Sequence, residues 1–231
     1  MRVLVVDVGG THVKVRATGQ RKSQKLRSGR AMTPEQMVSD VRQVTRRWKY
    51  DVVSIGYPGP VLHGMPTAEP YNLAPGWMGY DFEAAFGRPV KIINDAAMQA
   101  MGSYKGGKML FLGFGTGLGS AFIVDGILAA TELAHLPYKK GTFEDYVGRQ
   151  ALKKSGLKKW RADVEDVVAR LIGALQPDDV VLGGGNAKYL KPVPAGCRLG
   201  DNTNAILGGF RLWEKEAQTW QSVSTHALKA A

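Results

Sequence analysis

Asp95 is the residue in this sequence whose type and position best suit a catalytic base. It follows an apolar run at residues 90–93 and Asn94, and the alanine- and methionine-rich residues after it are typical of a helix start. A carboxylate at the carboxyl end of a strand, where a helix begins, lies where open α/β sheets bind ligands. Glycine-rich loops at residues 7–11 and 115–119 flank it in the sequence. Two phosphate-type loops around one base suggest phosphoryl transfer in a cleft between two halves.

The first glycine loop follows the apolar run at residues 3–6 and reads Asp7-Val8-Gly9-Gly10-Thr11. Gly9 and Gly10 allow backbone N–H groups to approach an anion closely. Asp7, at the end of the predicted strand, is well placed to hold Mg²⁺ directly or through water. Taken alone, the same residues could form an ordinary hairpin turn.

A second unit of the same kind lies later in the chain. The predicted strands at residues 109–114 and 121–124 are joined by a loop that contains Gly115, Thr116 and Gly117. This internal duplication is more informative than either loop alone. The loop lacks the Gly-Lys-Ser/Thr of a Walker motif, and no βαβ unit follows it as a dinucleotide-binding fingerprint would require. A third glycine loop, at Gly183, Gly184 and Gly185, follows a predicted strand at residues 180–182.

Several polar side chains could bind a sugar. Asn72 lies in a loop with Trp77, and an amide with an indole can hydrogen-bond and stack against a sugar. An ordinary loop without a ligand explains both residues equally well. Glu132, His135 and Glu144 could be metal ligands, but one histidine with scattered acids and no cysteine is a poor metal set. They fit better as acceptors for sugar hydroxyls, with a surface ion pair as the plain alternative.

The composition excludes several classes of protein. The 231 residues suffice for one large or two small domains, and 44% hydrophobic with 22% charged residues is ordinary for a globular protein. The single cysteine, Cys197, excludes an internal disulfide and argues against structural zinc. No apolar run approaches the roughly 20 residues of a membrane helix. The start, with an early charge and a short apolar run, does not resemble a signal peptide, so we expect a cytoplasmic protein without membrane contact.

The formal net charge of +11 is unusual and favours a polyanionic partner, although a merely soluble basic protein would show it too. Residues 14–30, beginning at Lys14, contain seven Lys or Arg and no acid. This run is either a solvated basic hairpin or a track beside the first phosphate loop that guides a long anionic substrate, with Lys14 as a phosphate contact. A second basic cluster comprises Lys153, Lys154, Lys158, Lys159 and Arg161.

The remaining patterns predict the elements that position these residues. Thr33, Pro34 and Gln36 are typical of a helix start with a capping box, followed by a core face at Met37, Val41, Val44 and Trp48. Asp81 should cap a short helix at residues 82–86 that Gly87 ends. Asp163 should cap a helix with an apolar face from Val164 to Leu175.

The predicted fold class is α/β with two domains. Residues 1–95 and a closing helix at about 204–217 form the first, residues 96–203 form the second, and the tail after Gln218 has no strong pattern.

The sequence resembles the ROK sugar kinases of the sugar kinase and actin superfamily, and is most similar to the polyphosphate glucokinase branch. The resemblance runs in family order from residue 3 to about residue 213, and the missing cysteine-rich zinc motif agrees with that branch. Ala134 departs from the glycine usual in the family. The motifs that carry the resemblance are Asp7-Val8-Gly9-Gly10-Thr11, Tyr57-Pro58-Gly59-Pro60-Val61, Asn94-Asp95-Ala96, Gly115-Thr116-Gly117-Leu118-Gly119, Thr131-Glu132-Leu133-Ala134-His135-Leu136 and Gly183-Gly184-Gly185.

The resemblance implies two ribonuclease-H-like (actin-like ATPase) lobes with an interlobe cleft, and a homodimer. It makes Asp95 the general base that takes the proton of a hexose 6-hydroxyl as that oxygen attacks the terminal phosphoryl group. The sugar hydroxyls would be bound by Asn94, Glu132, His135 and Glu144. The first two glycine loops would hold donor phosphates with Mg²⁺ near Asp7, and Gly183 to Gly185 would form the nucleoside side.

The first expectation is therefore a glucokinase that uses inorganic polyphosphate, with ATP as a further donor. The alternative enzyme is an ATP-dependent ROK hexokinase for mannose, fructose or an N-acetylhexosamine. A sugar-sensing, non-catalytic protein is a different class; the family's repressors carry an N-terminal helix-turn-helix, whereas this sequence begins with a core strand. Nucleic-acid binding through the basic surface is the remaining alternative, although no specific nucleic-acid motif is present.

Overall fold

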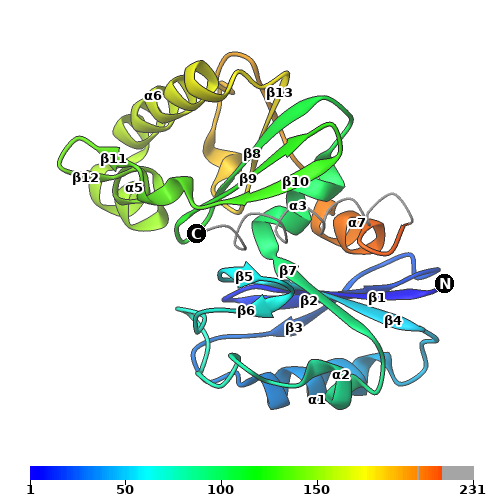
Figure 1. Cartoon of the computed structure of the whole chain (residues 1–231). Coiled ribbons are helices and arrows are strands. Elements are labelled where there is room, and N and C mark those ends of the chain that lie inside the picture. The colour runs from blue at the N-terminus through cyan, green and yellow to red at the C-terminus, as the bar shows by residue number, and fades with distance from the viewer. Residues whose placement is uncertain (202, 215–231) are drawn as a thin grey trace, which may run out of the picture. The chain divides into compact units, whose positions relative to one another are not determined.

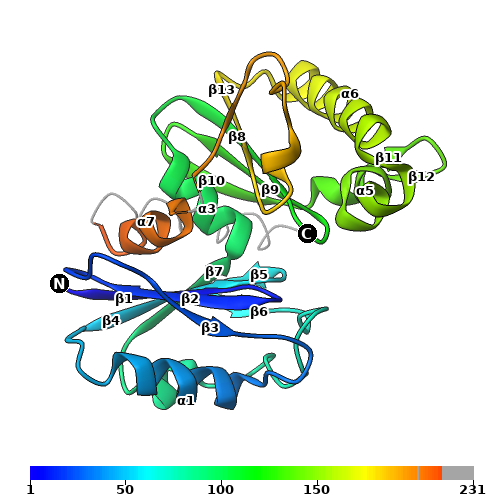
Figure 2. The same ribbon diagram turned by 180° about the vertical axis from the view of Figure 1, so that it is seen from behind.

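A computed structural model describes residues 1–201 and 203–214 of the chain. The chain divides into two compact units, drawn in Figures 1 and 2. Unit 1 comprises Met1–Met98 with the described residues from Ala205 onward, and unit 2 comprises Gln99–Asn204. The end of the predicted closing helix, at residues 215–217, and the tail after Gln218 lie outside the described residues.

Unit 1 is built on a five-stranded mixed sheet in the order β3-β2-β1-β4-β7. Neighbouring strands are antiparallel from β3 to β1 and parallel from β1 to β7. A small hairpin, β5 (Val61–Leu62) and β6 (Met65–Pro66), follows β4. The sheet strands are β1 (Val3–Val8), β2 (His12–Ala17), β3 (Gln24–Arg27), β4 (Val52–Tyr57) and β7 (Val90–Asn94).

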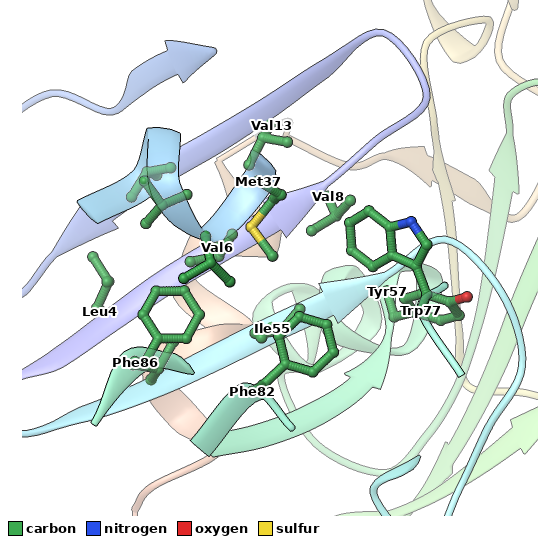
Figure 3. Close-up of a cluster of buried hydrophobic side chains, with 14 of the residues drawn as sticks. Leu4, Val6, Val8, Val13, Met37, Ile55, Tyr57, Trp77, Phe82 and Phe86 are labelled. Atoms are coloured by element: carbon green, nitrogen blue, oxygen red, sulfur yellow. The ribbon is translucent and has the colours of Figure 1, made fainter. Parts of the chain in front are cut away.

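The residues of β1 alternate between two hydrophobic clusters because successive side chains of a strand point to opposite faces. Leu4, Val6 and Val8 face α1 (Pro34–Thr45) and α2 (Phe82–Phe86), and Figure 3 shows them beside side chains of both helices. Val3 and Val5 face the opposite side, where they pack with α7 (Asn204–Arg211). Both faces of the sheet are therefore covered, which explains why every residue of β1 is buried.

The helix starts on the first face were largely predicted. The Thr33 side chain accepts a hydrogen bond from the Gln36 N–H and Pro34 begins α1, as expected. The capping-box prediction is wrong in its second half, because the Gln36 amide donates to the Asp40 carboxylate one turn later instead of returning to Thr33. The Asp81 cap of α2 and its left-handed end at Gly87 are confirmed.

The core face of α1 differs slightly from the predicted one. Met37 and Val41 are fully buried, as expected, and Val38 joins them. Val44 is only partly buried, and Trp48 lies beyond the helix and packs partly against the same cluster. The stripe therefore ends about one turn earlier than the spacing predicts.

Helix α7 closes unit 1 through an unusually close approach to the sheet. A Cβ atom on Gly209 would collide with the Val5 side chain, so only glycine allows this contact. The buried Ser54 Oγ donates to the Gly209 carbonyl at 2.6 Å and accepts from the indole N–H of Trp213 at 2.9 Å. Residues that are more than 150 positions apart are thus joined at one point of the core.

Unit 2 repeats the sheet of unit 1. Its order is β10-β9-β8-β13-β14, with antiparallel pairs from β10 to β8 and parallel pairs from β8 to β14. This confirms the α/β class and extends the predicted duplication from the loops to the whole sheet. The strands are β8 (Lys108–Phe114), β9 (Leu118–Val124), β10 (Ile127–Thr131), β13 (Asp179–Gly183) and β14 (Cys197–Leu199).

The long helix α6 (Leu157–Leu175) packs on the sheet of unit 2, and its buried face includes the predicted apolar residues. The prediction that Asp163 caps this helix is wrong, since the helix begins six residues earlier. Asp163 is a buried residue inside it and forms an ion pair with Lys139.

The remaining elements are α3 (Asp95–Ser103), which joins the units, α4 (Phe143–Val147), α5 (Arg149–Ser155), the short 3-10 helices Leu133–His135 and Ala187–Tyr189, and the hairpin β11 (Pro137–Tyr138) with β12 (Gly141–Thr142). Among the described residues, no helix is both long enough and apolar enough to cross a membrane.

Candidate active site

Asp95 stands at the junction predicted for it, where β7 ends and α3 begins. The Asn94 Oδ1 atom caps α3 by accepting from the N–H groups of Ala96 and Ala97 at 3.0 and 3.1 Å. The Asn94 amide nitrogen donates to the Gly59 carbonyl at 3.0 Å, and Asp95 Oδ1 accepts from the Ala96 N–H at 2.8 Å. Asn94 therefore fixes the turn that presents Asp95.

Asp7 and Lys14 form the electrostatic surroundings of Asp95. The side chain of Asp7 is 9% exposed, and its Oδ2 atom lies 3.0 Å from the Lys14 ammonium. Burial, and secondarily the negative charge of Asp7, raise the pKa of Asp95 to about 7, although the Ala96 N–H and Lys14 oppose this rise. A carboxyl group with such a pKa can accept and release a proton near neutral pH.

The strand register explains why the two carboxylates interact. Asp7 of β1 lies opposite Gly56 of β4, and Gly56 lies opposite Ile93 of β7, two residues before Asp95. A Cβ atom on Gly56 would collide with the end of Met98 and lie 3.6 Å from Asp7 Oδ1. Gly56, which has no side chain, thus leaves room on β4 for the side chains of Met98 and Asp7. Sequence reasoning missed this residue, although a glycine inside an apolar strand is a signal for close approach.

The first glycine loop connects β1 and β2 beside Asp7. Its turn is closed by the Gly9 N–H, which donates to the His12 carbonyl, and by Ser28, whose hydroxyl donates to the Gly9 carbonyl at 2.5 Å. Within the described part of the chain, the N–H groups of Gly10 and Thr11 make no hydrogen bond. Two adjacent free N–H groups are suited to bind a phosphate oxygen.

Asn72 also belongs to this group, because its Cβ atom packs directly on Gly10 and would lie 2.8 Å from a Cβ atom there. Trp77 does not belong to it. The expectation that its indole stacks on a sugar is wrong, since the side chain is fully buried between Tyr57 and Phe82, with ring centroids 5.9 and 6.1 Å away. Its neighbour Tyr71 is the exposed aromatic of the loop.

The second glycine loop, between β8 and β9, has the same design in unit 2. The Gly115 N–H closes the turn on the Gly117 carbonyl, and the N–H groups of Thr116 and Gly117 make no hydrogen bond within residues 1–201 and 203–214. The Glu144 carboxylate accepts from the Leu118 N–H at 3.1 Å and lies where a Cβ atom on Gly117 would be. Glu144 therefore supports this loop, a contact that its sequence position does not indicate.

The third glycine loop meets the second. Gly184 has a φ of +81°, and any side chain there would collide with the backbone of Phe114 at the end of β8. Asn186 donates from its backbone N–H to the Phe114 carbonyl at 2.9 Å and from its side chain to the Gly115 carbonyl at 3.0 Å. Gly184 and Asn186 thus join the third loop to residues 114 and 115, whereas Gly183 lies against the Phe111 ring and a Cβ atom on Gly185 would stand in open space. Asn186 is a candidate residue that the sequence analysis missed.

Glu132 precedes a single 3-10 turn and His135 ends it, and both side chains are exposed. The hydroxyl of Ser120 on β9 accepts from the Leu133 N–H, and the Leu136 carbonyl accepts from the Phe143 N–H at the start of α4. The turn is therefore fixed between β9 and the helix that carries Glu144. The candidate residues form two groups, one in each unit.

The donor groups near Asp95 fit Mg²⁺ better than a transition metal. No cluster of three or more His, Cys, Asp or Glu side chains that could hold a metal occurs among the described residues. Asp7 with Asp95 supplies two carboxylates beside a phosphate-type loop, and Mg²⁺ is commonly held by one or two carboxylates together with substrate phosphates and water. Mg²⁺ at this point stays a prediction.

The chain is similar to several known sugar kinases. Polyphosphate glucokinase of Mycobacterium tuberculosis (strain CDC 1551 / Oshkosh) is 28% identical over 202 residues, which cover 78% of this chain and 76% of that protein. The crystal structure of inorganic polyphosphate/ATP-glucomannokinase from Arthrobacter sp. strain KM matches with a TM-score of 0.75 at 24% identity, covering 90% of this chain and 96% of the other. A ROK family glucokinase from Streptomyces griseus, in complex with glucose and AMPPNP, matches with a TM-score of 0.75 at 16% identity, covering 92% and 99%.

The two solved structures show that the chain has the fold of ROK sugar kinases. The model of the ROK family matches residues 3–142, which include Asp7, the first two glycine loops, Asp95, Glu132 and His135. This match covers more than half of the sequence, and the chain therefore belongs to the ROK family.

Proposed function

We propose that this chain is a glucokinase that transfers a phosphoryl group from inorganic polyphosphate, with ATP as a second donor, to the 6-hydroxyl of glucose. The observation that carries the proposal is the arrangement at the carboxyl ends of β1 and β7. There Asp95 stands at the start of α3 and interacts with Asp7 and Lys14, beside a loop whose Gly10 and Thr11 N–H groups make no hydrogen bond to any described residue. Phosphoryl transfer requires these parts: a base, a metal-binding carboxylate and donors for phosphate oxygens.

In the proposed reaction, the 6-hydroxyl of the sugar donates its proton to the Asp95 carboxylate while its oxygen attacks the terminal phosphorus of the donor. The bond between that phosphorus and the bridging oxygen breaks, and the shortened phosphate chain leaves with the electron pair. The N–H groups of Gly10 and Thr11 and the Lys14 ammonium stabilise the charge on the phosphate oxygens. Mg²⁺ held by Asp7, with Asp95 beside it, would neutralise further phosphate charge.

The surface beside Asp7 supports polyphosphate as the donor. Lys14 lies opposite Lys25 and His12 opposite Arg27 on the antiparallel strands β2 and β3, so like charges or basic groups face each other across the ladder. Such pairs are destabilising unless an anion neutralises them, and of these four side chains only Lys14 has an acidic partner, Asp7, within the described residues. With Arg16 they form a basic strip, Lys14, Arg16, Lys25 and Arg27, on the sheet face that carries Asp7. The names of the Mycobacterium and Arthrobacter relatives point to the same donor.

The third glycine loop supports ATP as a second donor. Gly184 and Asn186 fix it against the second loop, and a loop fixed there could bind a nucleoside, which a purely polyphosphate-dependent enzyme would not need. The same observation favours the alternative function, an ATP-dependent ROK hexokinase for mannose, fructose or an N-acetylhexosamine.

For the sugar we propose Asn72, Asn94, Glu132, His135 and Glu144 as ligands of the hydroxyl groups. Exposed carboxylate and imidazole groups on a fixed turn, as at Glu132 and His135, are suitable hydrogen-bond partners for a polyol. Glu144 and Asn94 also make hydrogen bonds that hold nearby loops in place. We therefore expect their substitution to alter the loops as well as sugar binding.

The test is the rate of glucose 6-phosphate formation with Mg²⁺, comparing long-chain polyphosphate with ATP as donor and mannose with glucose as acceptor. The variant Lys25→Gln/Arg27→Gln should raise the KM for polyphosphate and leave the KM for ATP unchanged. Lys153→Gln/Lys154→Gln removes the same charge from exposed positions of α5 and serves as the control. Turnover with ATP alone would leave the hexokinase alternative, and no turnover with any hexose would refute both.

A further inference from the structure

A second basic site lies in unit 1, at the amino ends of the parallel strands. A cavity of about 960 Å³ is bounded by the residue before β1, the segment between α1 and β4, and the end of α2 with the residues before β7. Asp7 and Asp95 lie at the other ends of β1 and β7. The six residues of β1 span about 20 Å at about 3.3 Å per residue, so the cavity is separate from the candidate active site.

The charge of the cavity wall is strongly one-sided. Five of its side chains are cationic, and the single carboxylate, Asp51, is already paired with Arg2 through hydrogen bonds to both of its oxygens. Within the described part of the chain, the other four cations have no acidic partner. These four are Arg42, Arg46, Lys49 and Arg88.

Local structure explains only part of this cluster. The Arg42 guanidinium donates to the Ala85 carbonyl at 3.0 Å and that of Arg88 to the Gly87 carbonyl at 3.0 Å, so both satisfy carbonyl groups near the end of α2. Arg46 and Lys49 are exposed and line the same cavity, and within residues 1–201 and 203–214 neither makes such a bond. Like charges gathered around one cavity repel each other, and a bound anion would offset this electrostatic repulsion.

We propose that this cavity is an anchor site for a distant part of the polyphosphate chain whose end reacts at Asp95. The inference rests on the proposed function, because it takes its ligand from the proposed donor. Four of the five cations are arginines, whose planar guanidinium groups suit bidentate binding of phosphate oxygens. The aromatic residues Trp48 and Tyr50 of the wall pack partly against the core, so nucleic-acid binding through base stacking is made an outcome of the test below.

If the cavity is an anchor at the far end of the sheet, its effect on the KM should depend on the length of the polyphosphate chain. A short donor such as tripolyphosphate cannot reach from the active site across the sheet, whereas a long chain can occupy both sites at once. Occupying both sites raises the apparent affinity of the long chain only. The variant Arg46→Gln/Lys49→Gln should therefore raise the KM for long-chain polyphosphate about tenfold and leave kcat and the KM for tripolyphosphate and ATP unchanged.

Binding is measured by titration calorimetry of the whole chain, without glucose, using long-chain polyphosphate, tripolyphosphate and a single-stranded DNA oligonucleotide at equal salt. The dissociation constant for long-chain polyphosphate should rise about tenfold in Arg46→Gln/Lys49→Gln and less than about twofold in the control Lys153→Gln/Lys154→Gln. Equal losses in both variants would overturn the proposal, because they would reveal only the general positive field. DNA binding that depends on Arg46 and Lys49 as strongly as polyphosphate binding would also overturn it.

The emission of Trp48 gives a readout that needs no charge variant. Polyphosphate should change the tryptophan fluorescence of the natural chain, and Trp48→Phe should lower the size of this change, because Trp48 is the tryptophan that lines the cavity. A change of undiminished size in Trp48→Phe would refute the anchor, because it would come entirely from tryptophans outside the cavity. If calorimetry supports the anchor but no donor phosphorylates a hexose, the proposed function fails and the anion site stands. If turnover occurs and Arg46→Gln/Lys49→Gln behaves like the control, the anchor alone fails.

Discussion

Replacing Asp95 by asparagine should abolish catalysis and at the same time stabilise the fold at neutral and alkaline pH. The asparagine Oδ1 atom can still accept the Ala96 N–H bond that the aspartate accepts, and the volume of the side chain is nearly unchanged. The variant therefore removes a charge and little else. Loss of a general base typically lowers kcat about 10²–10⁴-fold, so turnover should fall by at least about 100-fold.

The size of the stabilisation follows from the pKa of Asp95. Its folded-state pKa of about 7 lies above the ordinary 3.8, so the folded chain holds a proton on Asp95 at pH values where the unfolded chain has lost it. The free energy of unfolding must then fall as the pH rises from about 4 to about 7, and stay low above that range. One pKa unit corresponds to 1.36 kcal/mol, which gives about 4 kcal/mol in full and about 2–4 kcal/mol after solvent screening of this partly exposed residue.

The assay is urea unfolding of the natural chain and of Asp95→Asn between pH 4 and pH 9. The two should be equally stable near pH 4, and the variant should gain about 2–4 kcal/mol relative to the natural chain by pH 8. Glu35→Gln removes an exposed carboxylate of the same unit and controls for net charge. A difference between Asp95→Asn and the natural chain that does not depend on pH would refute the reasoning. The kcat/KM of the natural chain should rise with pH through about 7.

Three further substitutions test neighbouring features. Lys14→Met removes a charge that lowers the pKa of Asp95, so the acid limb of the pH–rate profile should move to higher pH; an unmoved limb would contradict the pairing. Gly209→Ala should destabilise the chain by about 1–3 kcal/mol in thermal unfolding, because the added methyl group collides with Val5, whereas Gly173→Ala, in open space on α6, should be neutral or stabilising. Trp77→Phe should leave the KM for glucose unchanged, since the indole belongs to the core; a KM rise of tenfold or more would restore it as a sugar contact.

The parts of the site that depend on local signals could be predicted from the sequence. The apolar run before Asn94 and the helix formers after Asp95 specify the strand–helix junction without help from distant residues. Asp81 and Gly87 likewise mark the two ends of α2 through their own conformational preferences. The strand β10 was missed although Asp125 and Gly126, both with positive φ, form the kind of dipeptide that turns a two-residue hairpin.

The parts that depend on tertiary packing could not be predicted. Trp77 lies in a loop rich in glycine and proline, and only the folded chain shows that Tyr57 and Phe82 enclose it. Glu144 meets Gly117 from 27 positions away, and no pattern of either segment indicates this contact. The true start of α6 was the exception, because Trp160 continues the apolar face one turn before Val164 and could have revealed it.

The contact between α7 and the sheet of unit 1 has a consequence for the order in which the chain can fold during synthesis. Unit 1 is discontinuous, because residues 99–204 are inserted between its strands and the helix that covers Val5 and Ser54. At about 5–20 residues per second, a ribosome needs roughly 5–20 s to make that insertion. During this interval one apolar face of the first sheet is complete but uncovered, and unit 2 acquires all of its sequence before α7 is made. The nascent first unit must therefore wait, exposed to aggregation or protected by a chaperone, until Gly209 emerges.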